Sequence, residues 1–450
     1  MKRIIFFLIS GFWTIHLSAQ SLFESAIDST TSLNEQSTKL SMNGYARGSV
    51  YGGGETYDLA STFAEIAFQT QLQKGRTFLK SDIRFRKGVF FGENNQLIQL
   101  KELYAGYRGE QLDVLLGNQI ISWGRMDGFN PTNNITPNDY FFLSAESDDQ
   151  KESNFMLRLK YRFVPSVELE LIGIPFYMPS NYRYDLFDMG KNVKFVNEIL
   201  PTKELKNGTL AACLNFELPV AGWSLSYFRG YDPYHGFDVQ SVDWSTGAPF
   251  ITNISKTYRK TTLGTDVAIP LDKFIFRGEA AYNITKNPDS NMYIPLSDAS
   301  YVAGIESNFA GFTVIGQYIG KFTPDFSPLV LPVLSDPMNP LAQMQYANAL
   351  IDYENRLFNR RIFNQQEKTN HAASLTVSKS FGYDAWNAEC TVFYNFTSDE
   401  WLVRPKLIWK INDSLSAAVG GIYMSGGVKT LFGYSSTVMN GGFLELKASF

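Results

Sequence analysis

The chain has 450 residues, a formal net charge of −4, 44% hydrophobic residues and 15% aromatic residues. A mildly acidic chain lacks the basic surface that nucleic-acid binding requires. Mean hydropathy is −0.15, and no apolar run after residue 20 has the length of a transmembrane helix. The composition still allows a membrane β-barrel, because each of its strands presents only every second side chain to lipid.

The first twenty residues have the pattern of a secretory signal peptide. Lys2 and Arg3 form a positive n-region, residues 4–17 form an apolar h-region, and small residues precede a cleavage point at Ser21. Removing these two basic residues from 40 leaves 38 against 44 acidic ones, a balance of −6. We therefore expect export, a short periplasmic lead-in at 21–39 and a barrel at 40–450.

Period-two alternation of apolar and polar residues predicts strands from residue 76 onward. Examples are 76–89, 154–163 and, after a tight turn at Pro165, 167–171. The hairpin at Pro165 places a basic row beside an acidic row on its polar face. The polar faces of these and later strands carry the candidate pore-lining residues, which are Lys80, Asp82, Arg84, Arg86, Arg158, Lys160, Arg162, Glu168, Glu170, Arg277, Glu279, Arg404, Lys406, Glu445 and Lys447.

Turn signals then give the fold class. Eight short turns alternate with nine longer connections, which predicts an all-β, transmembrane, antiparallel up-and-down barrel of about 18 strands, with 16 to 20 allowed. With both termini at the periplasmic end, the long loops face outside; they are 124–153, 177–207, 231–255, 322–370 and 425–440. Aromatic residues near strand ends are expected to form interface girdles, and these are Trp223, Tyr227, Tyr282, Tyr318, Trp386, Tyr394, Trp401 and Trp409.

The segment that leads into the loop at 124–153 carries Gly117, Gln119, Trp123, Gly124, Asn130 and Pro131. These positions resemble a motif of several porin-like outer-membrane families, including the alginate-export type, of the kind expected in Bacteroidota. The resemblance covers some twenty residues and implies a porin-like barrel. The usual basic residue before Gln119 is Asn118 here, so an anionic-ligand site is not carried over. For Trp123 itself, an anchor at the membrane interface is the favoured interpretation.

The loop 124–153 follows the fifth strand, and in porins the loop at this position folds into the lumen. The analogy makes its acids candidates for a constriction, and they are Asp127, Asp139, Glu146, Asp148 and Asp149. Facing basic wall residues, these carboxylates would create a transverse field that favours polar solutes. The alternative is a loop outside the barrel with solvated acids.

Residues 339–359 have apolar residues at helical spacing and predict a helix within a long loop. Such a helix could be a lid or plug of the pore, or a surface helix packed on neighbouring loops. The chain then finishes with GGFLELKASF, which resembles the closing strand of outer-membrane barrels. In that class the terminal aromatic, Phe450 here, is the signal for the barrel-assembly machinery. We expect this strand to pair with the one that begins near Leu40.

These features predict a protein of the cell outer membrane that is not an enzyme, because His235 and His371 have no catalytic partner in a recognisable motif. No cofactor and no metal are expected. The favoured function is a porin-type channel for passive diffusion of small hydrophilic solutes, with little charge selectivity because inward acids and bases balance. Alternatives are a closed barrel subunit of a multi-protein outer-membrane or surface-binding complex, and an adhesin or receptor. Expected partners are outer-membrane lipid, the assembly machinery, polar solutes and possible proteins at the extracellular loops.

Overall fold

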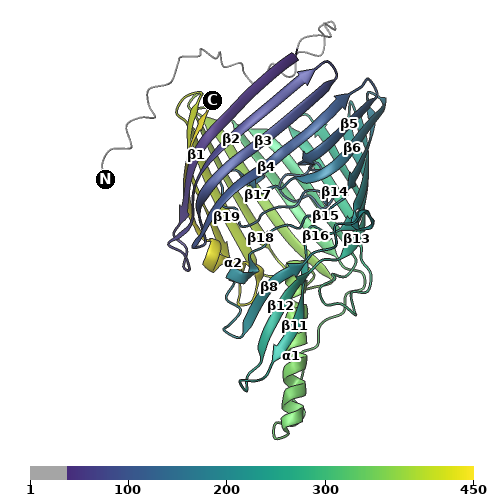
Figure 1. The fold of residues 1–450 in the computed structure, drawn as a ribbon, viewed down its shortest axis with the longest axis vertical. Helices are drawn as coiled ribbons and strands as arrows, with labels where there is room; N and C mark the ends of the chain where they lie inside the picture. The colour runs from purple at the N-terminus through teal and green to yellow at the C-terminus, as the bar shows by residue number, and fades with distance from the viewer. Residues whose placement is uncertain (1–37) are drawn as a thin grey trace, which may run out of the picture.

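A single closed sheet dominates the computed structural model, which describes residues 38–450 (Figure 1). The expected signal peptide and nearly all of the lead-in lie outside the described residues. The strands of the closed sheet are β1 (Thr38–Gly52), β2 (Leu59–Lys74), β3 (Thr77–Phe90), β4 (Glu93–Arg108), β5 (Leu112–Gln119), β6 (Asn154–Val164), β7 (Val167–Ile174), β9 (Thr209–Leu218), β10 (Ala221–Tyr231), β13 (Arg259–Leu271), β14 (Phe274–Ile284), β15 (Asp298–Phe309), β16 (Phe312–Phe322), β17 (Thr369–Phe381), β18 (Trp386–Asn395), β19 (Glu400–Lys410), β20 (Leu415–Ser425) and β21 (Gly441–Ser449).

The sheet is an 18-stranded antiparallel ring, because β1 pairs with both β2 and β21. The last residue completes the seam: the Gly44 N–H donates to the Phe450 carbonyl at 2.8 Å, and the Phe450 N–H donates to the Gly44 carbonyl at 2.9 Å. Closure leaves no exposed sheet edge, as a membrane requires. The predicted fold class and strand number are confirmed.

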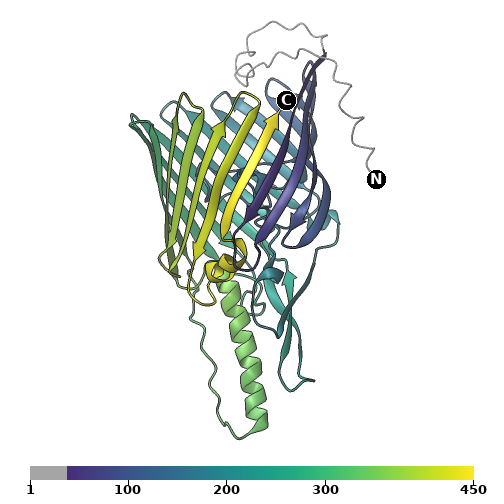
Figure 2. The same cartoon turned by 90° about the vertical axis from the view of Figure 1, so that its left-hand side faces the viewer.

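The two ends of the barrel differ in the length of their connections. Short turns join the strands at the end where the chain finishes, which we call the turn end (Figure 2). At the opposite end, the loop end, the long connections are 120–153, 175–208, 232–258, 285–297, 323–368 and 426–440. The prediction of nine long connections was wrong, since those at 53–58, 91–92 and 396–399 are short. The connections at 53–58, 91–92 and 396–399 join neighbouring strands by tight reversals of the chain.

Alternation sorts side chains between the two faces of the wall. Leu444 and Leu446 on β21 are 61% and 52% exposed on the outer face, whereas Glu445 between them is 4% exposed. Aromatic residues mark the margins of the apolar band: Trp386 pairs across strands with Trp409 near the turn end, and Tyr394 pairs with Trp401 near the loop end. Trp386 and Tyr394 are eight residues apart, which at about 3.3 Å per residue is about 26 Å along the strand. A tilt of about 40° reduces this to about 20 Å, close to the ~25 Å band of membrane barrels.

Further elements extend the loop end. A three-stranded sheet joins β8 (Val193–Ile199), β11 (Gly236–Asp243) and β12 (Phe250–Lys256), while α1 (Pro340–Ile362) projects away from the barrel and α2 (Leu431–Met439) lies at its rim (Figures 1 and 2). Asn339 caps α1 by accepting the Leu341 N–H at 2.9 Å. Neither helix of the described chain is long and apolar enough to cross a membrane.

The helix predicted at 339–359 therefore exists, and it is a surface helix rather than a plug. Its base packs on an aromatic cluster of the loop end, where Phe358 lies 5.5 Å from Phe237 and 5.7 Å from Tyr184 between ring centroids. Its opposite end points away from the barrel opening (Figure 2).

Candidate constriction site inside the barrel

The connection 120–153 enters the barrel and crosses it. The Gln317 amide on β16 donates to the Asp127 carbonyl at 2.8 Å, and the Arg404 guanidinium on β19 donates to the Ser144 carbonyl at 3.3 Å. These strands lie far from β5 and β6, which flank the connection, around the ring. A loop that reaches them through their inward side chains lies within the lumen. We call residues 120–153 the inner loop.

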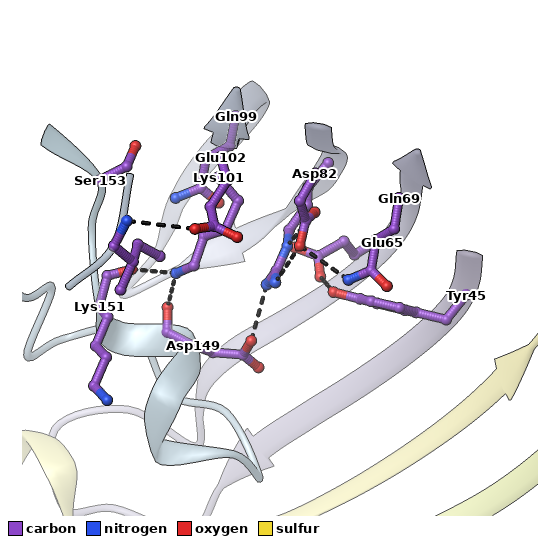
Figure 3. A network of polar contacts seen from close by, with 12 residues as sticks. Tyr45, Glu65, Gln69, Asp82, Gln99, Lys101, Glu102, Asp149, Lys151 and Ser153 are labelled. Carbon is purple, nitrogen blue, oxygen red and sulfur yellow. Dashed lines mark hydrogen bonds and ion pairs between the residues drawn. The ribbon is translucent and has the colours of Figure 1, made fainter. Parts of the chain in front are cut away.

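The last part of the inner loop is fixed to the wall by Asp149. Its carboxylate pairs with Arg47 of β1 at 2.6 Å and with Arg84 of β3 at 2.8 Å, and it accepts the Ser144 hydroxyl at 2.7 Å. Arg84 is in turn held by Asp82 at 3.0 Å. Figure 3 shows Asp149 reaching across to the polar row on β1 to β3. We call this set of contacts the Asp149 clamp.

Lys101 of β4 adds a second hold on the same segment. Its ammonium group donates to the Asp149 carbonyl at 2.7 Å and to the Lys151 carbonyl (Figure 3). The neighbouring Gln99 amide donates to the Glu152 carboxylate at 2.8 Å. A register shift opposite Asp82 and Ile83 places Lys101 in a β-bulge. The bulge turns Gln99, Lys101 and Glu102 inward together.

The charges of the clamp are buried and compensated. Glu65 on β2 pairs with Arg47 at 2.6 Å and with Arg86 at 2.6 Å, and all three side chains are less than 10% exposed. Burial alone would raise the pKa of Asp149, but Arg47 and the hydrogen bonds from Ser144 and Arg47 outweigh it and hold that pKa well below its usual range. The Asp149 carboxylate is therefore ionised whenever the clamp is formed.

The first part of the inner loop is fixed to the opposite wall. Arg125 pairs with Asp266 of β13 at 2.8 Å, and Asp127 pairs with Arg277 of β14 at 3.3 Å. Thr132 donates to Glu279 from its N–H at 2.8 Å and from its hydroxyl at 2.7 Å. The loop is thus held at both sides of the lumen by charged groups.

Gly124 permits this anchorage. Its φ of +97° is left-handed, and a Cβ there would lie 2.4 Å from the Glu279 Oε2 atom. The same oxygen is buried without a hydrogen-bond partner. Only glycine allows the loop backbone to approach the carboxylate this closely.

The fifteen predicted wall residues face the interior, because each is buried or lies an even number of positions from a buried residue of its own strand. Most form ion pairs with N–O distances of 2.5 to 3.0 Å, which are Arg84–Asp82 within β3 and, between neighbouring strands, Lys80–Glu102, Arg86–Glu65, Arg158–Glu170, Lys160–Glu168, Arg162–Asp113 and Arg277–Glu306. The looser contacts are Lys406 with Glu146 at 3.8 Å, Glu445 with Arg47 at 3.6 Å and Lys447 over the Tyr45 ring at 4.5 Å. The inner surface is therefore densely charged and locally neutral.

The five loop acids predicted for the constriction separate into two groups. Asp127, Glu146 and Asp149 reach basic wall residues. Asp148 pairs with Lys151 of its own loop at 2.9 Å, with its side chain 83% exposed, and Asp139 accepts the Phe141 N–H at 3.0 Å. The acids that meet the wall form direct ion pairs instead of facing it across a gap.

Other contributors were missed from the sequence. Arg47 and Glu65 lie on β1 and β2, where small and polar residues weaken the alternation, and Lys101 lies at a bulge. One signal was present for Arg47, which is in phase with Tyr45 and Tyr51 on the same strand. Arg125 is a loop residue whose partner, Asp266, is remote in sequence.

The interpretation of Trp123 as an interface anchor was wrong. Its side chain is 6% exposed and belongs to a buried cluster with Ile135, Met156 and Phe228. These residues lie where the inner loop covers the wall, so the ring packs inside the barrel and not at its lipid face. Among residues 38–450, no three His, Cys, Asp or Glu side chains are grouped to hold a metal ion.

Comparisons with known proteins identify the fold of this chain. The sequence matches no family model and no curated protein. The structure is similar to OccK5 (OpdH) of Pseudomonas aeruginosa, with a TM-score of 0.53 at 10% identity over 91% of this chain and 97% of that one. It is similar to OccAB3 of Acinetobacter baumannii, with a TM-score of 0.53 at 10% identity over 91% and 99%. It is also similar to P. aeruginosa OccK2 (OpdF), solved in complex with glucuronate, with a TM-score of 0.53 at 8% identity over 91% and 96%. The chain therefore has the fold of the Occ outer-membrane porins, an 18-stranded barrel.

Proposed function

We propose that this protein is an outer-membrane porin for passive diffusion of small hydrophilic solutes. The observation that carries the proposal is the inner loop, which crosses a charged lumen and is fixed to both walls by Asp149 and Arg125. A loop fixed across the lumen narrows it, and a charged lining favours polar solutes over apolar ones. The wall residues named above and the loop acids Asp127, Glu146 and Asp149 would line the path.

The apolar outer band and the fold shared with Occ porins support an outer-membrane location. We further propose that the chain reaches it by export and assembly, with Phe450 as the signal for the assembly machinery. The fit of the Phe450 ring over Gly44, where a Cβ would lie 2.5 Å from the ring, supports a structural role for this residue as well. The resemblance around Trp123 and Gly124 supports a place among porin-like families of the alginate-export type in Bacteroidota. No enzymatic activity forms part of the proposal.

The test is conduction by the purified, folded barrel. We expect discrete conductance steps in planar bilayers and swelling of liposomes in arabinose or glucose. Glucuronate, the solute bound to OccK2, is the natural anionic comparison. A folded barrel that leaves the bilayers and liposomes tight would overturn the proposal and favour a closed scaffold.

A further inference from the structure

A small cavity lies at the loop end, outside the inner-loop site. It is formed between the connection 285–297 and the base of α1, with a volume of about 50 Å³. Met292, Ile294 and Leu296 contribute apolar walls, and Arg356 and Arg360 of α1 contribute guanidinium groups. Residues four apart lie on one face of a helix, so the two arginines line the cavity from the same face of α1.

The two arginines differ in whether their positive charge is paired with a carboxylate. Arg356 pairs with Asp352 at 2.8 Å and donates to the Asp289 carbonyl at 3.5 Å. Arg360 lies over the Phe326 ring at 5.0 Å and has no ion pair with any residue of the described chain. Burial and the neighbouring Arg356 lower the pKa of Arg360. Its partly buried positive charge is therefore not neutralised by a carboxylate of residues 38–450.

The other polar groups of the cavity are already satisfied. The Asn359 amide donates to the Phe237 carbonyl at 2.7 Å and accepts the Phe237 N–H at 2.7 Å. The Gln365 amide donates to the Leu296 carbonyl at 2.8 Å and accepts the Leu296 N–H at 3.0 Å. These bonds fix the walls, while the Arg360 guanidinium has no hydrogen bond to any other residue of the described part of the chain and can bind a ligand.

Size and charge then select the ligand class. A buried water needs roughly 10 to 15 Å³ of cavity volume on this measure, so a cavity of about 50 Å³ has room for one small polyatomic group. Planar guanidinium donors match the oxygens of carboxylate, sulfate and phosphate. Asp289 also lines the cavity, but its side chain is exposed and forms no ion pair with Arg360 within residues 38–450. We propose that the Arg356–Arg360 cavity binds a small soluble oxyanion at the loop end of the barrel.

The experiment measures phosphorus-31 line broadening of inorganic phosphate by the folded, full barrel in detergent. Ionic strength is held constant with chloride, and sulfate serves as the competitor. We expect a saturable, sulfate-competed component for the wild type and about tenfold or greater weakening in Arg360→Gln, since the variant removes the charge-assisted hydrogen bonds to the anion. Arg360→Lys keeps the charge but loses the fork of donors, so we expect an intermediate affinity.

Arg361→Gln is the matched control, because it removes the same charge from the adjacent residue outside the cavity lining. It should bind phosphate like the wild type. Unchanged binding in Arg360→Gln, or equal losses in both Gln variants, would overturn the proposal. Heat-modifiable electrophoretic migration of each variant confirms that its barrel is folded. If Arg360→Gln does not fold, Arg360→Lys is the test, and full wild-type affinity in that variant would overturn the proposal. Binding is read without conduction, so this outcome is independent of the porin proposal.

Discussion

Asp149 joins the inner loop to two strands that are not its sequence neighbours. Its partners Arg47 and Arg84 are 2% and 9% exposed, so solvent screens these pairs weakly. Removing one member of a buried ion pair leaves the other charge uncompensated, at a cost of about 3 to 5 kcal/mol. That cost is larger than the net contribution of about 1 kcal/mol from an ordinary hydrogen bond that holds the same part of the loop.

Asp149→Asn should therefore release the last part of the inner loop. We expect larger fluctuations of the open-channel current, with the barrel itself still folded, in single-channel recordings. Asp148→Asn is the control, because its side chain is largely solvated and pairs only within the loop. Equal current noise in the two variants would show that the clamp does not fix the loop.

The pH dependence of the clamp follows from the depressed pKa of Asp149. A carboxylate whose pKa falls on folding contributes stability above its free value of about 3.9, and this contribution is lost as the pH falls through the folded value. We expect current noise to stay constant from about pH 8 to 5 and to rise only below about 4. Noise that rises near pH 6 would contradict this assignment.

Gly124 offers a separate test of the opposite anchor. Gly124→Ala places a Cβ against Glu279 and in a left-handed conformation, so we expect a loss of about 1 to 3 kcal/mol. Gly128→Ala is matched, since Gly128 has a φ of +86° but nothing within 4 Å of its Cβ. The thermal midpoint of unfolding should fall further for Gly124→Ala. Equal shifts would mean that backbone strain alone matters.

At the scale of elements, the strands were predictable where one face is fully apolar. Segments such as 76–89 and 154–163 match β3 and β6 within one or two residues. The bulge at Lys101 was not predictable, because it reverses the inward parity of β4 without any break in composition. The clamp could not be derived either, since Asp149 and Arg47 are brought together by the path of a loop whose acids were identified without their partners.

The helix α1 can be separated from the channel by deletion. Its base is buried through Ile351 and Phe358, whereas residues 330–350 belong to the projecting part. Replacing 330–350 with a short Gly-Ser linker should leave single-channel conductance unchanged. A rise in conductance would place this segment over the pore. Deletion of 140–148 in the inner loop is the positive control and should raise it.

On the scale of the whole molecule, closure and charge pairing act together. The ring of strands places all polar faces in one interior, and antiparallel neighbours bring opposite charges side by side, as in the rows of β6 and β7. Because these charges are paired, the wall can hold many charged residues and still produce only a small net electric field in the lumen. The fold was accessible from the sequence because alternation and turn spacing are local, whereas the lumen lining depends on contacts between distant strands.

Charge selectivity tests that balance directly. Because most basic wall residues have a carboxylate within 4 Å, we expect the pore to favour neither cations nor anions strongly. In a tenfold potassium chloride gradient, ideal selectivity gives a reversal potential of about 59 mV. A value below about a third of that is expected for the wild type. Glu306→Gln frees Arg277 from its 2.5 Å partner and should shift the potential toward anion preference. The matched Arg277→Gln should shift the reversal potential toward cation preference. A near-ideal reversal potential in the wild type would contradict the balance and would mean that unpaired charges control the narrowest point of the pore.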